Sequence, residues 1–158
     1  MRRSLSILTL VLVLAALLCG CNSARQEIVC NELQIDLPAA FIDFSEEGAK
    51  EGLAFNYADT EIGVCGSFEE KTYLQQYFPD IDPAMYAKLF LESNGIASQV
   101  ETADAIPRFT YSTGGYTYLC GVFESGENYW VVQSYCKTED FPANKETMWG
   151  YIASVILG

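Results

Sequence analysis

The sequence predicts an α+β domain in which an antiparallel β-sheet is flanked by helices on both faces, forming an α/β/α sandwich. Three observations predict this class: several β-type segments joined by short turns in the second half of the chain, a well-delimited helix before them, and an apolar helical segment after them. The chain has 158 residues, of which 50% are hydrophobic and 13% aromatic, so its size and composition suit one folded domain.

Two segments in the first half show the alternation of apolar and polar residues that is typical of half-buried strands. Residues 33–37 form the first segment. Residues 53–57 and 62–64 form the second, a hairpin whose turn we expect at Asp59-Thr60. The charged, glycine-bounded stretch 45–52 is predicted to be a loop.

Three helices are predicted. Residues 69–78 carry aromatic and aliphatic side chains at helical spacing. The second helix has the sharpest limits, because Asp82 suits the N-cap, Pro83 the first helical position and Gly95 the left-handed position after the last turn. An apolar segment at the end of the chain, residues 142–157, is expected to be a helix docked on the sheet.

The chain beyond Gly95 predicts an antiparallel meander. Its expected strands are 96–101, 108–112, 116–123 and 129–135. We expect the last hairpin to close with Glu124 opposite Tyr129, which places Cys120 and Cys136 on opposite faces of the sheet and disfavours a bridge between them. Both faces of this hairpin carry large apolar side chains, so helices are expected on both sides.

The charge balance excludes several classes of partner. With Arg2 and Arg3 set aside, seven basic residues face 21 acidic ones, a balance of −14. Such a body lacks the basic surface that phosphate binding requires, so we expect no nucleic-acid partner and no attraction to an anionic lipid surface. The acidic residues are spread between Glu27 and Glu146, which is typical of a solvated surface.

The N-terminus resembles a targeting segment. Arg2 and Arg3 precede an apolar run, residues 5–18. As a helix this run spans about 21 Å, short of the ~30 Å hydrocarbon core, so we do not expect a stable membrane span. The run ends in Leu18-Cys19-Gly20-Cys21, which resembles the lipobox of bacterial lipoproteins, where the cysteine after a small residue is diacylated.

This resemblance sets the expected domain organisation. Residues 1–20 form a lipoprotein signal peptide, residues 21–26 comprise the lipidated Cys21 and a short tether, and residues 27–158 form a single α+β domain. Two acyl chains are what stable anchoring generally needs, so we expect the protein on the extracytoplasmic face of the cell membrane. The alternative is an ordinary secretory signal with an incidental cysteine.

Four cysteines remain in the predicted domain: Cys30, Cys65, Cys120 and Cys136. They form no CxxC element and the chain contains no histidine, so neither a metal site nor an activated thiol is expected. An even number of cysteines in an exported domain is compatible with disulfides, and buried free thiols are the other interpretation. The sequence leaves this choice open.

The sequence contains few residues or motifs that support catalysis. The absence of histidine excludes Ser-His-Asp and Cys-His nucleophilic catalysis. No phosphate-binding GxxxxGK or GxGxxG motif occurs, and residues 79–83 supply too few oxygen ligands for a calcium loop. Paired acids such as Glu46-Glu47 and Glu69-Glu70 suit acid and base roles, but solvated charge is the simpler interpretation. We expect no enzyme activity, metal or cofactor.

Aromatic residues of the meander could form a stacking platform for a sugar, a peptide or a cell-wall fragment; they are Tyr111, Tyr116, Tyr118, Phe123, Tyr129, Trp130 and Tyr135. Tyr111, Tyr129 and Trp130 are the candidate ligand contacts among them. Cross-strand packing, which suits aromatic side chains, is the alternative and the simpler interpretation.

Several segments resemble small Mog1/PsbP-like lipoproteins of Gram-positive bacteria, over about residues 31–157. The segments that carry this resemblance are LPAAF (37–41), NGI (94–96), RFTY (108–111), GGYTY (114–118), VFE (122–124) and YWVVQ (129–133). The resemblance implies an α/β/α sandwich around an antiparallel sheet. The family has diverse roles, including photosystem assembly and binding of a small GTPase, and no shared catalytic motif, so the resemblance assigns no activity.

The leading functional hypothesis is a membrane-anchored extracytoplasmic lipoprotein that acts as a binding module without catalytic activity. Its expected partners are the membrane, through the lipid anchor, and another extracytoplasmic protein or a cell-wall component. Two alternatives belong to other classes. One is a structural or assembly accessory of a cell-envelope complex, and the other is a small carboxylate-based hydrolase.

Overall fold

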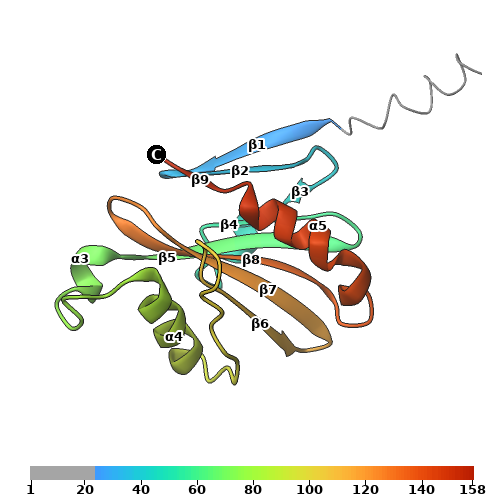
Figure 1. Ribbon diagram of the computed structural model, residues 1–158. Coiled ribbons are helices and arrows are strands. Elements are labelled where there is room, and N and C mark those ends of the chain that lie inside the picture. Colours follow the sequence, from blue (N-terminus) through green and yellow to red (C-terminus); the bar gives the residue numbers. More distant parts are fainter. Residues whose placement is uncertain (1–23) are drawn as a thin grey trace, which may run out of the picture.

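Two antiparallel sheets form the framework of the protein in the computed structural model, which describes residues 24–158 (Figure 1). The expected signal peptide and Cys21 lie outside the described residues. The large sheet has the strand order β3 (Ile42–Asp43), β4 (Phe55–Ala58), β5 (Ile62–Glu70), β8 (Asn128–Lys137), β7 (Tyr116–Glu124) and β6 (Arg108–Thr113). The small sheet has the order β1 (Arg25–Cys30), β2 (Leu33–Pro38) and β9 (Ile156–Leu157).

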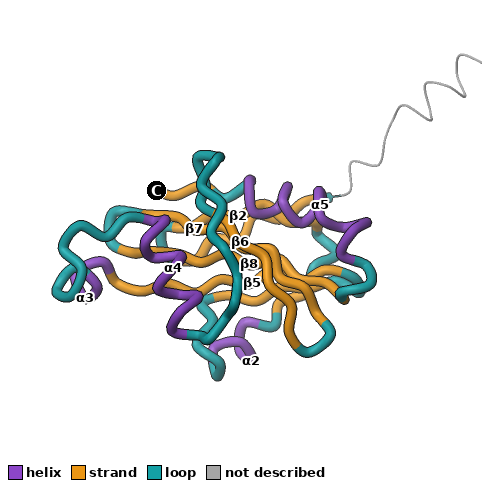
Figure 2. The backbone as a smooth tube through the Cα atoms, turned by 60° about the horizontal axis from the view of Figure 1, so that its bottom comes forward, coloured by secondary structure: helices purple, strands orange, loops and turns teal. Residues whose placement is uncertain are grey.

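Helices cover the large sheet on both faces. Helix α5 (Phe141–Ala153) and the small sheet lie over one face (Figure 1). Helix α4 (Pro83–Ser93) and the short helix α3 (Lys71–Leu74) lie on the other, which Figure 2 brings forward. A further short helix, α2 (Ser45–Ala49), follows β3. The structure therefore confirms the predicted α+β class with an antiparallel sheet packed between helices.

Strand β8 accounts for the two-sided packing. Its side chains Trp130 and Val132 belong to the core under α5, whereas Tyr129 and Val131 belong to the core under α4. All four are completely buried. Consecutive side chains of a strand point to opposite faces, so this one strand supplies both cores, and each large side chain contributes about 1.5–3 kcal/mol by its burial.

The register of the last hairpin agrees with the prediction. Glu124 pairs with Tyr129, and Cys120 pairs with Gln133. Cys120 consequently lies in the core under α4 and Cys136 in the core under α5. The two thiols are on opposite faces of the sheet, as the sequence predicts.

Helix α4 begins and ends where the sequence predicts. Oδ1 of Asp82 accepts a hydrogen bond from the amide of Met85 at 2.7 Å, and Pro83 is the first helical residue. Gly95 follows the helix with φ +64°, a conformation that other residues rarely adopt. Local chemistry at the two ends is sufficient to delimit this helix.

Three predictions in the first half of the domain need correction. The β4–β5 turn lies one residue later than expected, because Oδ1 of Asp59 accepts hydrogen bonds from the amides of Glu61 and Ile62 at 2.7 and 2.8 Å. The predicted loop 45–52 contains the short helix α2. In addition, β1 begins at Arg25, inside the segment expected to be a tether.

Three further boundaries differ from the predictions, and in two of them pairing with a distant strand outweighs local spacing. The helix expected over 69–78 starts only at Lys71, since β5 pairs with β8 through Glu70. The expected strand 96–101 has a single bridge to β6, and Ser98 donates its hydroxyl to a backbone oxygen of β6 instead. Helix α5 ends at Ala153, and the last residues form β9 against β2. Over residues 24–158, no helix is long and apolar enough to cross a membrane.

Gly121 allows α5 to approach β7 closely. A Cβ atom at this position would lie 2.5 Å from Cγ2 of Ile152, which is completely buried. We expect Gly121→Ala to lower the free energy of unfolding by about 1–3 kcal/mol, because the core must shift to admit the methyl group. Denaturant unfolding measures this change.

Gly150→Ala is the matched control for this substitution. Gly150 lies within α5, and an added Cβ would meet nothing within 4 Å. Its replacement should raise the free energy of unfolding by about 0.5–1 kcal/mol through helix propensity. A Gly121→Ala protein as stable as the wild type would contradict the close approach of helix and sheet.

Candidate functional site

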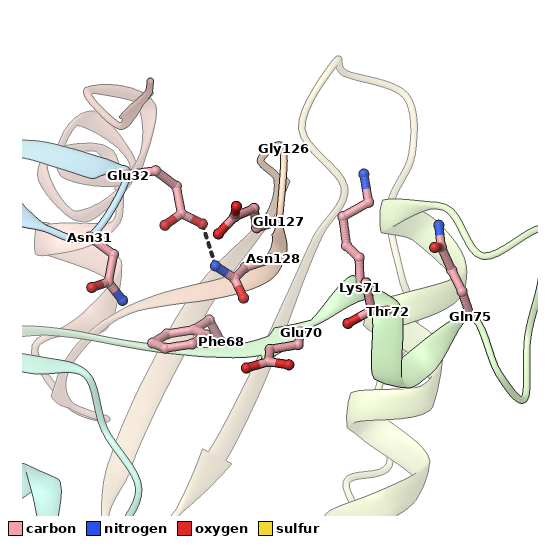
Figure 3. Close-up of a pocket in the computed structure, with 10 residues that line it drawn as sticks. All are labelled: Asn31, Glu32, Phe68, Glu70, Lys71, Thr72, Gln75, Gly126, Glu127 and Asn128. Atoms are coloured by element: carbon pink, nitrogen blue, oxygen red, sulfur yellow. Dashed lines mark hydrogen bonds between the residues drawn. The ribbon is translucent and has the colours of Figure 1, made fainter.

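A cleft of about 840 Å³ opens at one end of the domain, where three segments from different parts of the chain meet (Figure 3). One wall is the β1–β2 turn, the other is the junction of β5 and α3, and the β7–β8 turn lies between them. Its lining residues are Asn31, Glu32, Phe68, Glu70, Lys71, Thr72, Gln75, Gly126, Glu127 and Asn128.

Glu32 is the most constrained side chain of the cleft. Its Oε1 atom accepts hydrogen bonds from Oγ of Ser125 at 2.6 Å, Nδ2 of Asn128 at 2.6 Å and Nε1 of Trp130 at 3.0 Å. Partial burial raises the pKa of Glu32, but these hydrogen bonds outweigh it and lower the pKa to about 2 from an ordinary value of 4.5. The carboxylate therefore stays ionised at any physiological pH.

The backbone around Glu32 is held as firmly as its side chain. Asn31 and Glu32 form the two-residue connection between β1 and β2, and Asn31 has φ +52°, which asparagine tolerates better than most residues. The carbonyl oxygen of Glu32 accepts a hydrogen bond from the amide of Gly158 at 2.9 Å. The turn is thus tied to the C-terminus of the chain and to the large sheet.

The opposite wall contains a cation that is already paired. Nζ of Lys71 contacts the carboxylate of Glu124, donates to the carbonyl oxygen of Ser125 at 3.3 Å and lies 5.5 Å from the ring centroid of Tyr129. The hydrogen bond to Glu124 raises the pKa of Lys71. Lys71 therefore positions the β7–β8 turn and does not neutralise the rest of the cleft.

Two further carboxylates complete the polar lining. Glu127 lies between the two walls in Figure 3 and Glu70 ends β5 at the wall opposite Glu32; neither forms a salt bridge within the described residues. The cleft is therefore electronegative, with the ring of Phe68 as its apolar part. Among residues 24–158, no group of His, Cys, Asp or Glu side chains is arranged to hold a metal ion.

The structure separates the three predicted aromatic contacts. Tyr129 and Trp130 are completely buried on opposite faces of β8, so their burial removes them as ligand contacts. Tyr129 donates its hydroxyl to the carbonyl oxygen of Ile81, and Trp130 donates to Glu32. Only Tyr111 is partly accessible. Tyr129 and Trp130 therefore pack in the two cores and are not available to a ligand.

Tyr111 belongs to a row of tyrosines on the large sheet. Its ring stacks on that of Tyr118 with centroids 4.8 Å apart, and Tyr118 lies 5.3 Å from Tyr135. The hydroxyl of Tyr111 donates to Oε1 of Gln133 at 2.8 Å. Burial raises the pKa of Tyr135 to about 12. These rings stack on one another across neighbouring strands, the arrangement expected of cross-strand packing.

All four cysteines of the domain are free thiols in the structure. Cys65, Cys120 and Cys136 are buried, and Cys30 is partly buried. Burial raises the pKa of Cys65 to about 12 and also raises that of Cys120. Protonated, buried thiols behave as small apolar side chains, so none of these three is activated for chemistry.

Sequence reasoning did not single out Glu32. The signal available was weak: an Asn-Glu pair just before the alternating segment that became β2. The donors to its carboxylate lie 93 to 98 residues further along the chain. Of the paired acids considered, Glu70 reaches the cleft, whereas Glu46 and Glu47 are exposed in α2.

Removal of the Glu32 carboxylate should destabilise the protein. We expect Glu32→Ala to lower the free energy of unfolding by about 2–3 kcal/mol, because it leaves three donors without their charged acceptor. Glu70→Ala is the control from the same cleft and should change stability by less than about 0.5 kcal/mol. Equal effects of the two substitutions in denaturant unfolding would refute this role.

The low pKa of Glu32 also predicts a pH dependence. Its folded-state pKa of about 2 lies below the ordinary 4.5, so its contribution to stability is complete above pH 4.5 and is lost as the pH falls toward 2. Wild type and Glu32→Gln should therefore converge in stability over that interval. A stability difference that stayed constant down to pH 2 would contradict the assigned pKa.

Comparison with known proteins supports the fold alone. No protein-family model matches the chain, and no curated protein matches it in sequence. The solution structure of cyanobacterial PsbP (CyanoP) from Synechocystis sp. PCC 6803 is similar, with a TM-score of 0.55 and 12% sequence identity over 88% of this chain and 96% of that chain. At this identity the two proteins share an architecture, and the expected resemblance is confirmed as a PsbP-like fold.

Proposed function

We propose that this protein is a lipid-anchored, extracytoplasmic binding module that contacts its partner through the Glu32 cleft. The observation that carries the proposal is the rigid carboxylate of Glu32, held by three donors beside Glu70 and Glu127. A preorganised acidic cleft binds without first ordering its side chains. The partner expected there is an extracytoplasmic protein or a cell-wall component with complementary polar or cationic groups.

Binding suits this geometry better than acid–base catalysis does. A carboxylate pair that cleaves glycosidic bonds needs one member that is protonated near neutral pH. Glu32, with a pKa of about 2, does not supply that proton. Its Oε1 atom is also occupied by the three hydrogen bonds to the protein itself, which favours a structural and recognition role over proton transfer.

The position of the cleft is compatible with an anchor at Cys21. The described chain enters β1 at Arg25, and the cleft lies beyond Cys30 at the other end of the same strand. Six residues of strand span about 20 Å. A lipid at Cys21 would therefore hold the protein by the end of β1 that is remote from the cleft, leaving the cleft accessible to a partner.

Acylation tests the anchoring part of the proposal. Cells that express the full chain and receive labelled palmitate should yield a labelled protein in the membrane fraction. Cys21→Ser should lose the label and leave the membrane, because the acceptor thiol is gone. Cys19→Ser is the matched control and should keep the label. Label on Cys21→Ser, or none on the wild type, would refute the anchor.

Site-specific photocrosslinking in intact membranes tests the binding part. A photoreactive residue at Gln75, an exposed position of the cleft, should give a discrete adduct. The same residue at Glu139, exposed at the opposite end of the domain, should give none. Glu127→Lys should reduce the Gln75 adduct at least severalfold by reversing a charge in the cleft. Adducts of equal yield from both positions would reject the cleft as the binding site.

A further inference from the structure

A second hollow lies on the other side of α3 from the Glu32 cleft. It is a groove of about 440 Å³ between α3 and α4. Its floor is formed by Leu74, Phe78, Leu89 and Phe90. Three of these four side chains are only partly buried, so apolar surface remains accessible along the groove.

Tyr86 places a polar group in this apolar groove. The residue is only 3% exposed and its ring packs on Tyr129 with centroids 5.2 Å apart. Its hydroxyl forms no hydrogen bond within residues 24–158. Every fully buried side-chain oxygen in this part of the chain does form one, so the Tyr86 hydroxyl is not fully buried. Tyr86 lines the groove, and its small accessible part includes the hydroxyl. An accessible hydroxyl within an otherwise apolar surface can form a hydrogen bond with a bound segment.

Acidic side chains flank the apolar floor. Glu69 and Glu92 both line the groove, and neither forms a salt bridge in the described part of the chain. Tyr73 in α3 and Tyr77 just after it are 55% and 64% exposed, and their rings pack on each other outside the lining of the groove. An apolar floor between unpaired carboxylates complements a segment with apolar side chains on one face and basic side chains beside them.

We propose that the α3–α4 groove binds an amphipathic, basic segment of a partner protein. Its apolar side chains would cover the floor, its Lys or Arg side chains would pair with Glu69 and Glu92, and a polar group of the segment would satisfy the hydroxyl of Tyr86. A second copy of this acidic chain and an anionic lipid surface are both disfavoured by like-charge repulsion. The inference does not depend on the Glu32 cleft.

A designed pair of peptides tests the groove. The full acylated chain is placed in phosphatidylcholine nanodiscs, with empty discs subtracted, and is titrated with an 18-residue helical peptide of leucine on one face and lysine on the other. A second peptide carries glutamate in place of lysine. We expect only the lysine peptide to bind in fluorescence anisotropy, and we expect it to slow hydrogen exchange within residues 69–93.

Three variants locate the site. Glu69→Gln combined with Glu92→Gln should weaken binding roughly tenfold at low salt, and Tyr86→Phe should weaken it about threefold to tenfold by removing one hydrogen bond. Glu139→Gln combined with Glu146→Gln makes the same change in charge beside α5, on the other face of the sheet, and should leave affinity unchanged. Equal weakening by both charge pairs, binding of both peptides, or binding to empty discs alone would overturn the inference.

Discussion

The carboxylate of Glu32 joins the β1–β2 turn to the β7–β8 turn, two turns that no backbone hydrogen bond connects within residues 24–158. It comes from the β1–β2 turn of the small sheet and accepts hydrogen bonds from the β7–β8 turn and from Trp130 of the large sheet. A charged acceptor with three donors is a strong interaction, and its loss leaves Nδ2 of Asn128 and Nε1 of Trp130 without this partner, whereas Oγ of Ser125 keeps the carbonyl oxygen of Asn128. Together with the apolar core that the two sheets share, this contact fixes the position of the β1–β2 turn and hence the shape of the cleft.

The two faces of the large sheet have different surroundings. Under α5 and the small sheet, side chains from most elements form one continuous core. Under α4, a smaller core leaves the α3–α4 groove on one side and the stacked tyrosines on the other. Because β8 supplies completely buried side chains to both cores, the framework between these surfaces is rigid. Candidate binding surfaces therefore lie around the sheet edges and helix ends.

Both candidate binding surfaces of this molecule are acidic. Among residues 24–158, both hollows next to α3 expose carboxylates without ionic partners, and Lys71 in the Glu32 cleft is paired with Glu124. An acidic surface is repelled by anionic headgroups and attracts cationic groups of other molecules. The PsbP-like architecture supplies the scaffold for these surfaces, and the side chains on them decide what is bound.

The sequence by itself determined the elements whose signals are local. The cap at Asp82 and the glycine at position 95 delimit α4, and the two-residue period of the last hairpin sets its register. Only the tertiary structure decided where β5 ends, that the C-terminus forms a strand, and which acid lies in the cleft. Periodicity and capping act between neighbours in the chain, whereas Glu32 meets donors more than 90 residues away, and such contacts form only when the sheets pack.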